Sequence, residues 1–88
     1  MTAPAAADIA DRLGAAGVAV APGRLRLERR EDRWLVRLPG ERLAWFPANA
    51  RGAGRLRRER AVLRLLASRC TFAVPRILFE SPEGWDVR

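Results

Sequence analysis

The 88-residue sequence contains no histidine and no lysine, and it has a single cysteine. Histidine is the most frequent general base in enzymes, and lysine forms Schiff bases and grips phosphates, so chemistry that depends on either residue is excluded. The single cysteine, Cys70, permits no internal disulfide, and no neighbouring group completes a metal site around it. The absences therefore rule out a disulfide scaffold and most histidine- or lysine-dependent catalysis.

Long apolar runs are also missing. No stretch approaches the roughly 18 apolar residues that a membrane-spanning helix needs. The N-terminal segment has no basic start and no apolar centre, and it carries Asp8 and Asp11, so we do not expect it to be a signal peptide. We therefore expect a cytoplasmic protein with no membrane partner.

What the sequence does contain is arginine. All 17 basic residues are arginine, against 10 acidic residues, which gives a formal net charge of +7. Abundant alanine, glycine and proline alongside arginine are typical of a GC-rich coding sequence, which explains the choice of arginine over lysine; a selected arginine function is the alternative. The charge is compatible with acidic partners but does not define a fold.

The spacing of apolar residues predicts an α+β domain. Residues 1–23 are expected to form a tail and a short helix over 8–16, with Ile9 and Leu13 on one side and Gly17 as its stop. Alternating patterns then predict strands, and a 3.6-residue period predicts one main helix. The expected strands are 24–28, 33–38, 42–46, 76–80 and 85–88, and the helix is 54–69. The result is an antiparallel sheet of about five strands with one main helix packed on it.

The expected core face of the sheet depends on the turn at Pro39-Gly40. If that turn keeps Leu38 opposite Glu41, alternation places five apolar side chains on one side of the sheet. These are Trp34, Val36, Leu38, Leu43 and Trp45. Because proline cannot take the positive φ of a type I′ turn, a type II turn or a wider loop is expected there.

One residue of the main helix breaks its pattern. Leu56, Leu63 and Leu66 form the apolar stripe with Val62 at its edge, and Arg57, Arg60 and Arg64 are expected on the opposite arc. Glu59 falls inside the stripe, where a carboxylate is costly unless it is paired or hydrogen-bonded. Either Glu59 lies at the rim and pairs with a nearby arginine, or it is aimed at the sheet for a functional reason.

The ordered set of these features resembles the N-terminal lobe of the aminoglycoside phosphotransferase family, whose members have a protein-kinase-like fold. The matching residues are Leu43 to Pro47, Arg51-Gly52, Arg55-Leu56 with Glu59, Val62-Leu63, Leu66 and Val74-Pro75. The resemblance covers residues 24–88 and implies a kinase-like N-lobe there. It also implies an ATP-dependent small-molecule phosphotransferase with Mg²⁺.

The resemblance assigns nucleotide-binding positions to four residues. Glu59 matches the helix glutamate that pairs with the basic residue of the third strand, and that basic residue falls at Trp45. The family's glycine-rich loop falls around 28–32, where Glu31 and Asp32 match its pattern but no glycine occurs. Because Trp45 cannot donate a charged hydrogen bond, we expect no saturable ATP binding by this chain below about millimolar.

The catalytic half of the family's fold is expected to lie in a C-terminal lobe that these residues do not include. That lobe holds the catalytic aspartate, the Mg²⁺ ligands and the acceptor pocket, so we expect no turnover by this chain alone, assign no catalytic or metal-binding residue, and leave the phosphate acceptor undefined. An alternative is a small basic module that binds nucleic acid or a protein partner through the arginines of the main helix. Nucleic acid is the less expected partner, since Glu59 interrupts the cluster and no binding signature occurs.

Overall fold

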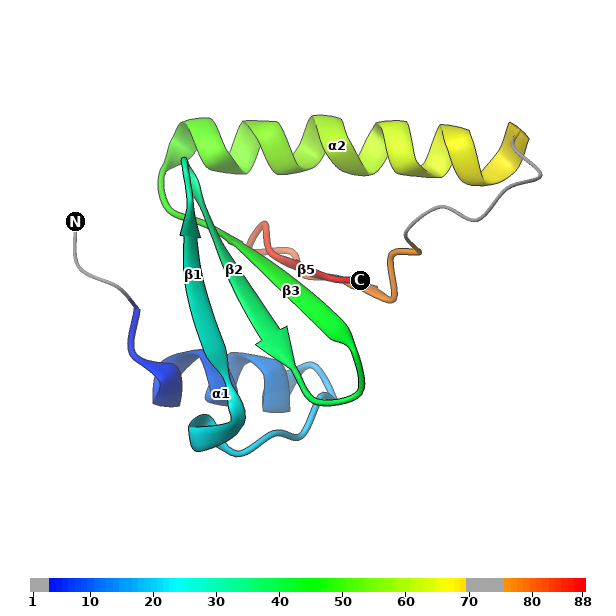
Figure 1. Ribbon diagram of the computed structural model, residues 1–88. Coiled ribbons are helices and arrows are strands. Elements are labelled where there is room, and N and C mark those ends of the chain that lie inside the picture. The colour runs from blue at the N-terminus through cyan, green and yellow to red at the C-terminus, as the bar shows by residue number, and fades with distance from the viewer. Residues whose placement is uncertain (1–3, 70–75) are drawn as a thin grey trace.

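The computed structural model describes residues 4–69 and 76–88, which form a mixed α+β structure with two α-helices and an open antiparallel sheet (Figure 1). Five strands make up the sheet, in the order β1-β2-β3-β5-β4. They are β1 (Arg26–Arg30), β2 (Arg33–Leu38), β3 (Arg42–Pro47), β4 (Phe79–Glu80) and β5 (Asp86–Val87). The predicted five-stranded antiparallel sheet is therefore confirmed, whereas the interpretations of Cys70 and Val74-Pro75 fall outside the described residues.

Helix α1 (Ala6–Ala15) ends where the sequence predicts a stop. Gly17 has a φ of 91°, its N–H donates to the carbonyl oxygen of Gly14, and the N–H of Val18 donates to that of Leu13. These two bonds form a Schellman motif, which satisfies the last carbonyl groups of the helix and favours glycine at the left-handed position. The chain then makes a short 3₁₀ turn at Pro22–Arg24, which delays the start of β1 by two residues relative to the prediction.

Helix α2 (Ala50–Arg69) begins four residues before the predicted start. Asn49 is the N-cap: its side-chain oxygen accepts a hydrogen bond of 2.9 Å from the backbone N–H of Gly52. An asparagine cap satisfies one of the N–H groups that the first turn leaves free. The predicted start of the helix at residue 54 was therefore wrong, because Asn49 caps the helix and residues 50–53 form its first turn.

The register of β2 and β3 differs by one residue from the prediction. Leu38 pairs with Arg42, and Trp34 pairs with Phe46. The connecting loop has three residues, and its last two, Gly40 and Glu41, both have positive φ. Proline cannot take the first position of a two-residue type I′ turn, so the loop is one residue longer, and a shift of one residue sends every side chain of β3 to the other face.

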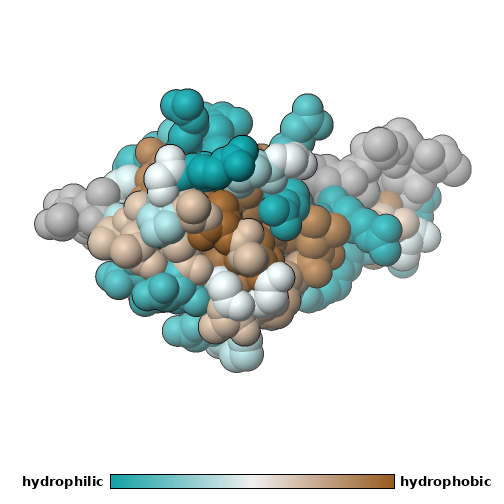
Figure 2. Space-filling view, turned by 90° about the horizontal axis from the view of Figure 1, so that it is seen from below, coloured by the Kyte–Doolittle hydropathy of each residue, from teal (hydrophilic) through white to brown (hydrophobic). Residues whose placement is uncertain are grey.

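The predicted core face is therefore half wrong. Trp34, Val36 and Leu38 lie on one side as predicted, but Leu43 and Trp45 lie on the other, and Ala44 and Phe46 take their places. This side carries the main apolar core and is covered by α1 through Ile9 and Leu13, with Trp85 and Val87 completing it. Viewed from the α1 end, the surface has a central apolar area bordered by hydrophilic groups (Figure 2).

Helix α2 lies on the opposite side of the sheet from α1 (Figure 1). Leu56 of α2 and Leu35 of β2 are buried there, while Val62 is 53% exposed, as its place at the edge of the predicted stripe requires. Much of this side is ionic, because strand alternation points Arg33, Asp86 and Arg88 toward α2. Within residues 4–69 and 76–88, no helix combines the length and apolar character needed to cross a membrane.

Candidate functional site

The first turn of α2 is held against the turn between β1 and β2. A β-carbon on Gly52 would lie 1.9 Å from the carbonyl oxygen of Asp32, so only glycine permits this approach. The same carbonyl accepts a 2.8 Å hydrogen bond from the N–H of Ala48, and the Asp32 carboxylate accepts one of 3.1 Å from Asn49. Glu31 forms an ion pair with Arg55. The turn and the helix start are therefore joined at several points.

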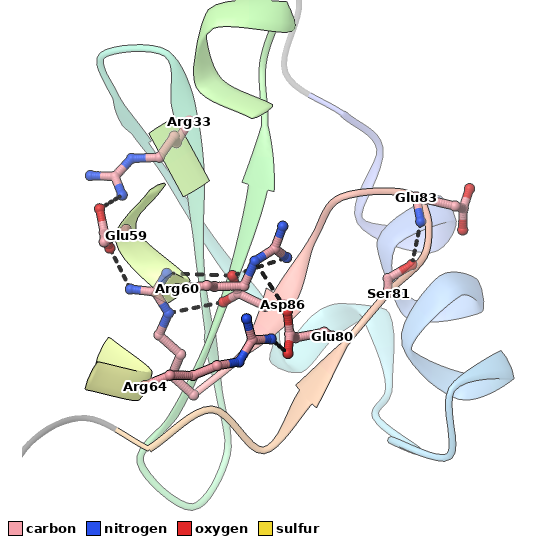
Figure 3. Close-up of polar contacts among 9 residues, drawn as sticks. Arg33, Glu59, Arg60, Arg64, Glu80, Ser81, Glu83 and Asp86 are labelled. Atoms are coloured by element: carbon pink, nitrogen blue, oxygen red, sulfur yellow. Dashed lines mark hydrogen bonds and ion pairs between the residues drawn. The ribbon is translucent and has the colours of Figure 1, made fainter. Parts of the chain in front are cut away.

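Glu59 points from α2 toward the sheet (Figure 3) and contacts one arginine of β2 and another that directly follows β5. Arg33 Nη1 of β2 donates a 2.6 Å hydrogen bond to Glu59 Oε2, and Arg88 Nη1, directly after β5, donates to Oε1. Burial acts to raise the pKa of Glu59, but Arg88 and Arg33 together outweigh it and lower the pKa. Glu59 is thus an anion held between two guanidinium groups, so the predicted pairing with an arginine is confirmed, and a functional reason for its position stays a prediction.

The ion pair of Arg33 with Glu59 is one end of a chain of alternating charges that runs along the boundary between α2 and the sheet. Its members, in order, are Arg33, Glu59, Arg88, Asp86, Arg60, Glu80 and Arg64 (Figure 3). Asp86 is fully buried, and this burial raises its pKa although Arg88 and Arg60 oppose the shift. Four arginines and three carboxylates therefore neutralise one another almost completely in a partly buried position.

The buried position of Arg60 corrects a prediction. The helical arc that we expected to be solvent-facing includes Arg60, yet its side chain is only 8% exposed. Arg60 lies 3.4 Å from Glu80 and 3.6 Å from Asp86, measured between the closest nitrogen and oxygen atoms. At 100° per residue it is 40° from Leu56, so the sheet-facing arc of α2 is wide enough to include it. A buried arginine is stable there because two carboxylates face it.

The guanidinium of Arg33 also covers Trp45. Its central carbon lies 4.2 Å from the centre of the Trp45 ring, which is within the range of a cation–π contact. In front of this pair is a hollow of about 590 Å³, which we call the Arg33 hollow. It is lined by Glu31, Leu35 and Trp45 and by four arginines, namely Arg29, Arg30, Arg33 and Arg55. These lining residues carry a formal charge of +3, which favours an anion.

The structure brings together three of the four residues assigned from the sequence. Trp45 and Glu59 meet through Arg33, and Glu31 lines the Arg33 hollow beside Trp45. Asp32 does not line the hollow; it is engaged by the start of α2. The turn that carries Glu31 and Asp32 has only two residues between the paired Arg30 and Arg33, and Glu31 has a φ of 55°.

Sequence reasoning missed the two arginines that bind Glu59. A signal for Arg33 was present: it stands two residues before Leu35 and therefore shares a strand face with it. This signal alone could not place Arg33 near Trp45, because the predicted register of β2 and β3 put Trp45 on the other face of the sheet. The observed pairing of Leu35 with Trp45 places Arg33 and the tryptophan on the same face. Arg88 carried no local signal, since its partner is 29 residues away in the sequence.

The donor atoms of the site suit an anion and not a metal ion. In the part of the chain that the structure describes, no group of three or more histidine, cysteine, aspartate or glutamate side chains is arranged to hold a metal. The Arg33 hollow instead presents guanidinium groups, which suit phosphate. Compared with known proteins, the sequence matches no protein-family model and no curated protein.

Proposed function

We propose that residues 24–88 are the nucleotide-covering lobe of an aminoglycoside-phosphotransferase-like kinase, and that they are not catalytically competent on their own. Phosphoryl transfer depends on positioning and on charge neutralisation, and the lobe we describe supplies part of both. In this proposal the nucleotide lies on the α2 side of the sheet, with its phosphates in the Arg33 hollow. A second lobe provides the catalytic aspartate, the Mg²⁺ ligands and the acceptor pocket.

One observation carries the proposal. Glu59 extends from the helix that follows β3 and meets a guanidinium directly over the β3 side chain at position 45. The resemblance implies a helix glutamate paired with a cation at this place, and here the cation comes from Arg33 of β2. The five-stranded antiparallel sheet with a helix between β3 and β4 supports the same reading.

The α2 side of the sheet also has partly exposed apolar residues, as a lobe that contacts a nucleotide requires. Leu43 and Trp45 are only half-buried although they lie in the middle of the sheet, and α2 leaves them partly open. An adenine ring needs apolar contacts on both of its faces, and this lobe offers one face. ATP is thus the proposed ligand, and residues 24–88 supply one half of its pocket.

Nuclear magnetic resonance with a non-hydrolysable ATP analogue tests the proposal, because the three tryptophans report on different sides of the sheet. Trp45 lies on the α2 side, whereas Trp34 and Trp85 lie on the α1 side. We expect the indole signal of Trp45 and the methyl signals of Leu43 to shift in the millimolar range. Shifts confined to Trp34 and Trp85, or none at several millimolar, would contradict it.

The alternative, a basic module for nucleic acid, gives a different outcome in the same setting. An oligonucleotide bound by arginines through its phosphates releases counterions, so its affinity falls steeply as salt rises. Tight oligonucleotide binding with that dependence, together with no response to the ATP analogue, would favour the alternative. The ion pairs of Arg55, Arg60 and Arg64 argue against it, because they occupy guanidinium groups that would have to contact phosphate.

A further inference from the structure

We infer that Arg33 is the phosphate-binding residue of this lobe, and that it replaces from β2 the basic residue missing at Trp45 of β3. The inference rests on the proposed function for the identity of the ligand as a nucleotide. Its geometric basis is independent: a buried guanidinium with an unused donor, placed at the wall of a positively charged hollow.

The unused donor is the Nε–H group of Arg33. Arg33 Nη1 donates to Glu59, while Nε is buried and has no hydrogen-bond partner among the described residues. A buried N–H group without a partner costs roughly 1–3 kcal/mol, so it is seldom left free without a reason. A phosphate that enters the Arg33 hollow and displaces the side chains covering Nε would satisfy this N–H group, and guanidinium groups bind phosphate through two parallel N–H bonds.

Two contacts fix the orientation of this guanidinium before any ligand arrives. Glu59 holds one end of it at 2.6 Å, and the Trp45 ring lies 4.2 Å beneath its central carbon. The side chain is only 9% exposed, so few other rotamers are open to it. A fixed guanidinium loses little conformational entropy when it binds, which favours recognition over simple attraction.

Trp45 therefore supports the phosphate-binding guanidinium of Arg33, although tryptophan itself carries no charge. Arg33 lies diagonally across from Trp45 in the pairing of β2 with β3, and its guanidinium lies over the flat apolar indole ring. Tryptophan offers the best surface for a cation–π contact. The pair Arg33 and Trp45 thus substitutes for one basic residue, with the charge on β2 and the support on β3.

Inorganic tripolyphosphate is the first probe, because it carries the phosphates without adenine. On ¹⁵N-labelled chain we expect the Nε–Hε signal of Arg33 and the indole signal of Trp45 to move together, saturating at about millimolar. The arginine signal is assigned on ¹³C,¹⁵N-labelled wild-type chain by correlation through the side-chain carbons to the backbone amide of Arg33, so the assignment needs no variant. A titration in which other arginine signals move and that of Arg33 does not would overturn the inference.

Arg33→Lys and Arg24→Lys form a matched pair of variants. Both keep the net charge, but Arg24 is exposed at the other end of the sheet, where it lines a separate hollow. Lysine lacks the planar fork, so Arg33→Lys should weaken tripolyphosphate binding roughly tenfold or more, and Arg24→Lys should leave it unchanged. Equal effects would mean non-specific attraction and would overturn the inference. If Arg33→Lys fails to fold, as circular dichroism would show, the wild-type Nε–Hε titration decides alone.

ATP without metal is the second probe, and it separates the inference from the proposed function. Binding of tripolyphosphate at Arg33 with no gain from adenosine supports the inference and contradicts the nucleotide assignment. Contacts of adenine with Leu43 while the Arg33 signal stays still support the proposed function and overturn the inference. Shifts of both the Leu43 and the Arg33 signals on addition of ATP support the proposed function and the inference together.

Discussion

Gly52 and Asp32 approach each other so closely that a β-carbon on the glycine would lie 1.9 Å from the aspartate carbonyl oxygen. The contact joins the start of α2 to the turn between β1 and β2, and backbone atoms on both sides leave no room to adjust. Gly52→Ala should therefore lower the free energy of unfolding by roughly 1–3 kcal/mol, the usual cost of overpacking. Urea unfolding measures it.

Gly54→Ala is the matched control for that change. It lies in the same helix, and a β-carbon there would meet only the ends of two arginine side chains at 3.5 and 3.6 Å. Because alanine favours helix over glycine, this variant should gain roughly 0.5–1 kcal/mol. A similar loss of unfolding free energy in both variants would contradict a specific steric effect of the close approach between Gly52 and Asp32.

Arg60→Met should be far more costly than Arg57→Met. Arg60 is 6% exposed and faces Glu80 and Asp86, whereas Arg57 is exposed. Removing one partner of a buried ion pair costs about 3–5 kcal/mol, and the partial exposure of Glu80 places Arg60 at the lower end of that range. A surface change such as Arg57→Met should stay within about 0.5 kcal/mol. Equal thermal midpoints of the two variants would show that Arg60 is solvated.

Glu59 should make stability sensitive to acid. Its pKa is lowered by Arg88 and Arg33 against the opposing effect of burial, so its contribution is complete above the unfolded pKa of about 4.3 and is lost as the pH falls through the folded value. Asp86 has a raised pKa and acts in the opposite direction, adding stability as the pH falls toward about 3.9. Glu59→Gln should therefore flatten the acid side of the stability profile.

The measurement for Glu59 is urea unfolding from pH 3 to pH 7, with Glu83→Gln as the control. Glu83 is an exposed residue of the turn before β5. At pH 7 we expect Glu59→Gln to cost about 2 kcal/mol, since it leaves two guanidinium groups with a weaker acceptor. An unchanged slope below pH 5 in Glu59→Gln would show that other carboxylates set the acid limit.

Leu13→Ala should show that α1 is part of the same cooperative unit as the sheet. Leu13 is fully buried in the cluster that contains Phe46 and Trp85. Emptying a buried leucine site costs roughly 2–5 kcal/mol, and the loss should appear in the fluorescence transition of the tryptophans as well as in circular dichroism. Val62→Ala, at a 53% exposed site, should change little. A separate early transition for α1 would contradict a single unit.

The sequence was sufficient to predict local features that depend on a few neighbouring residues. Gly17 ends α1 because the conformation at its own position and hydrogen bonds to the preceding turn decide the end of the helix. Strand β2 has the predicted bounds because its strand-favouring residues, Trp34 to Val36 and Leu38, stand between two turns. The sequence was insufficient where the position of a residue depends on pairing between strands. The one-residue difference in the loop at Pro39 changed which face Leu43 and Trp45 occupy, and with it the surroundings of Glu59.

The candidate site shows the same division. Glu59 was identified because a carboxylate within the apolar stripe of a helix breaks the pattern of its neighbours and is costly unless it is paired. Arg33 was not, because nothing about an arginine in a strand rich in arginine is unusual until its neighbours across the sheet are known. Its importance comes from Trp45 and Glu59, which approach it from β3 and α2.

The position of β5 between β3 and β4 has a consequence for synthesis of the chain. Strands β1, β2 and β3 with α2 precede it in sequence and can pair as soon as they leave the ribosome, but the open edge of β3 waits for residues 86–87. Until then, its unpaired N–H and C=O groups are available to any other strand. Slowing translation before Trp85 should therefore promote aggregation of nascent chains, while slowing it before Arg26, when β3 has not yet been made, should not.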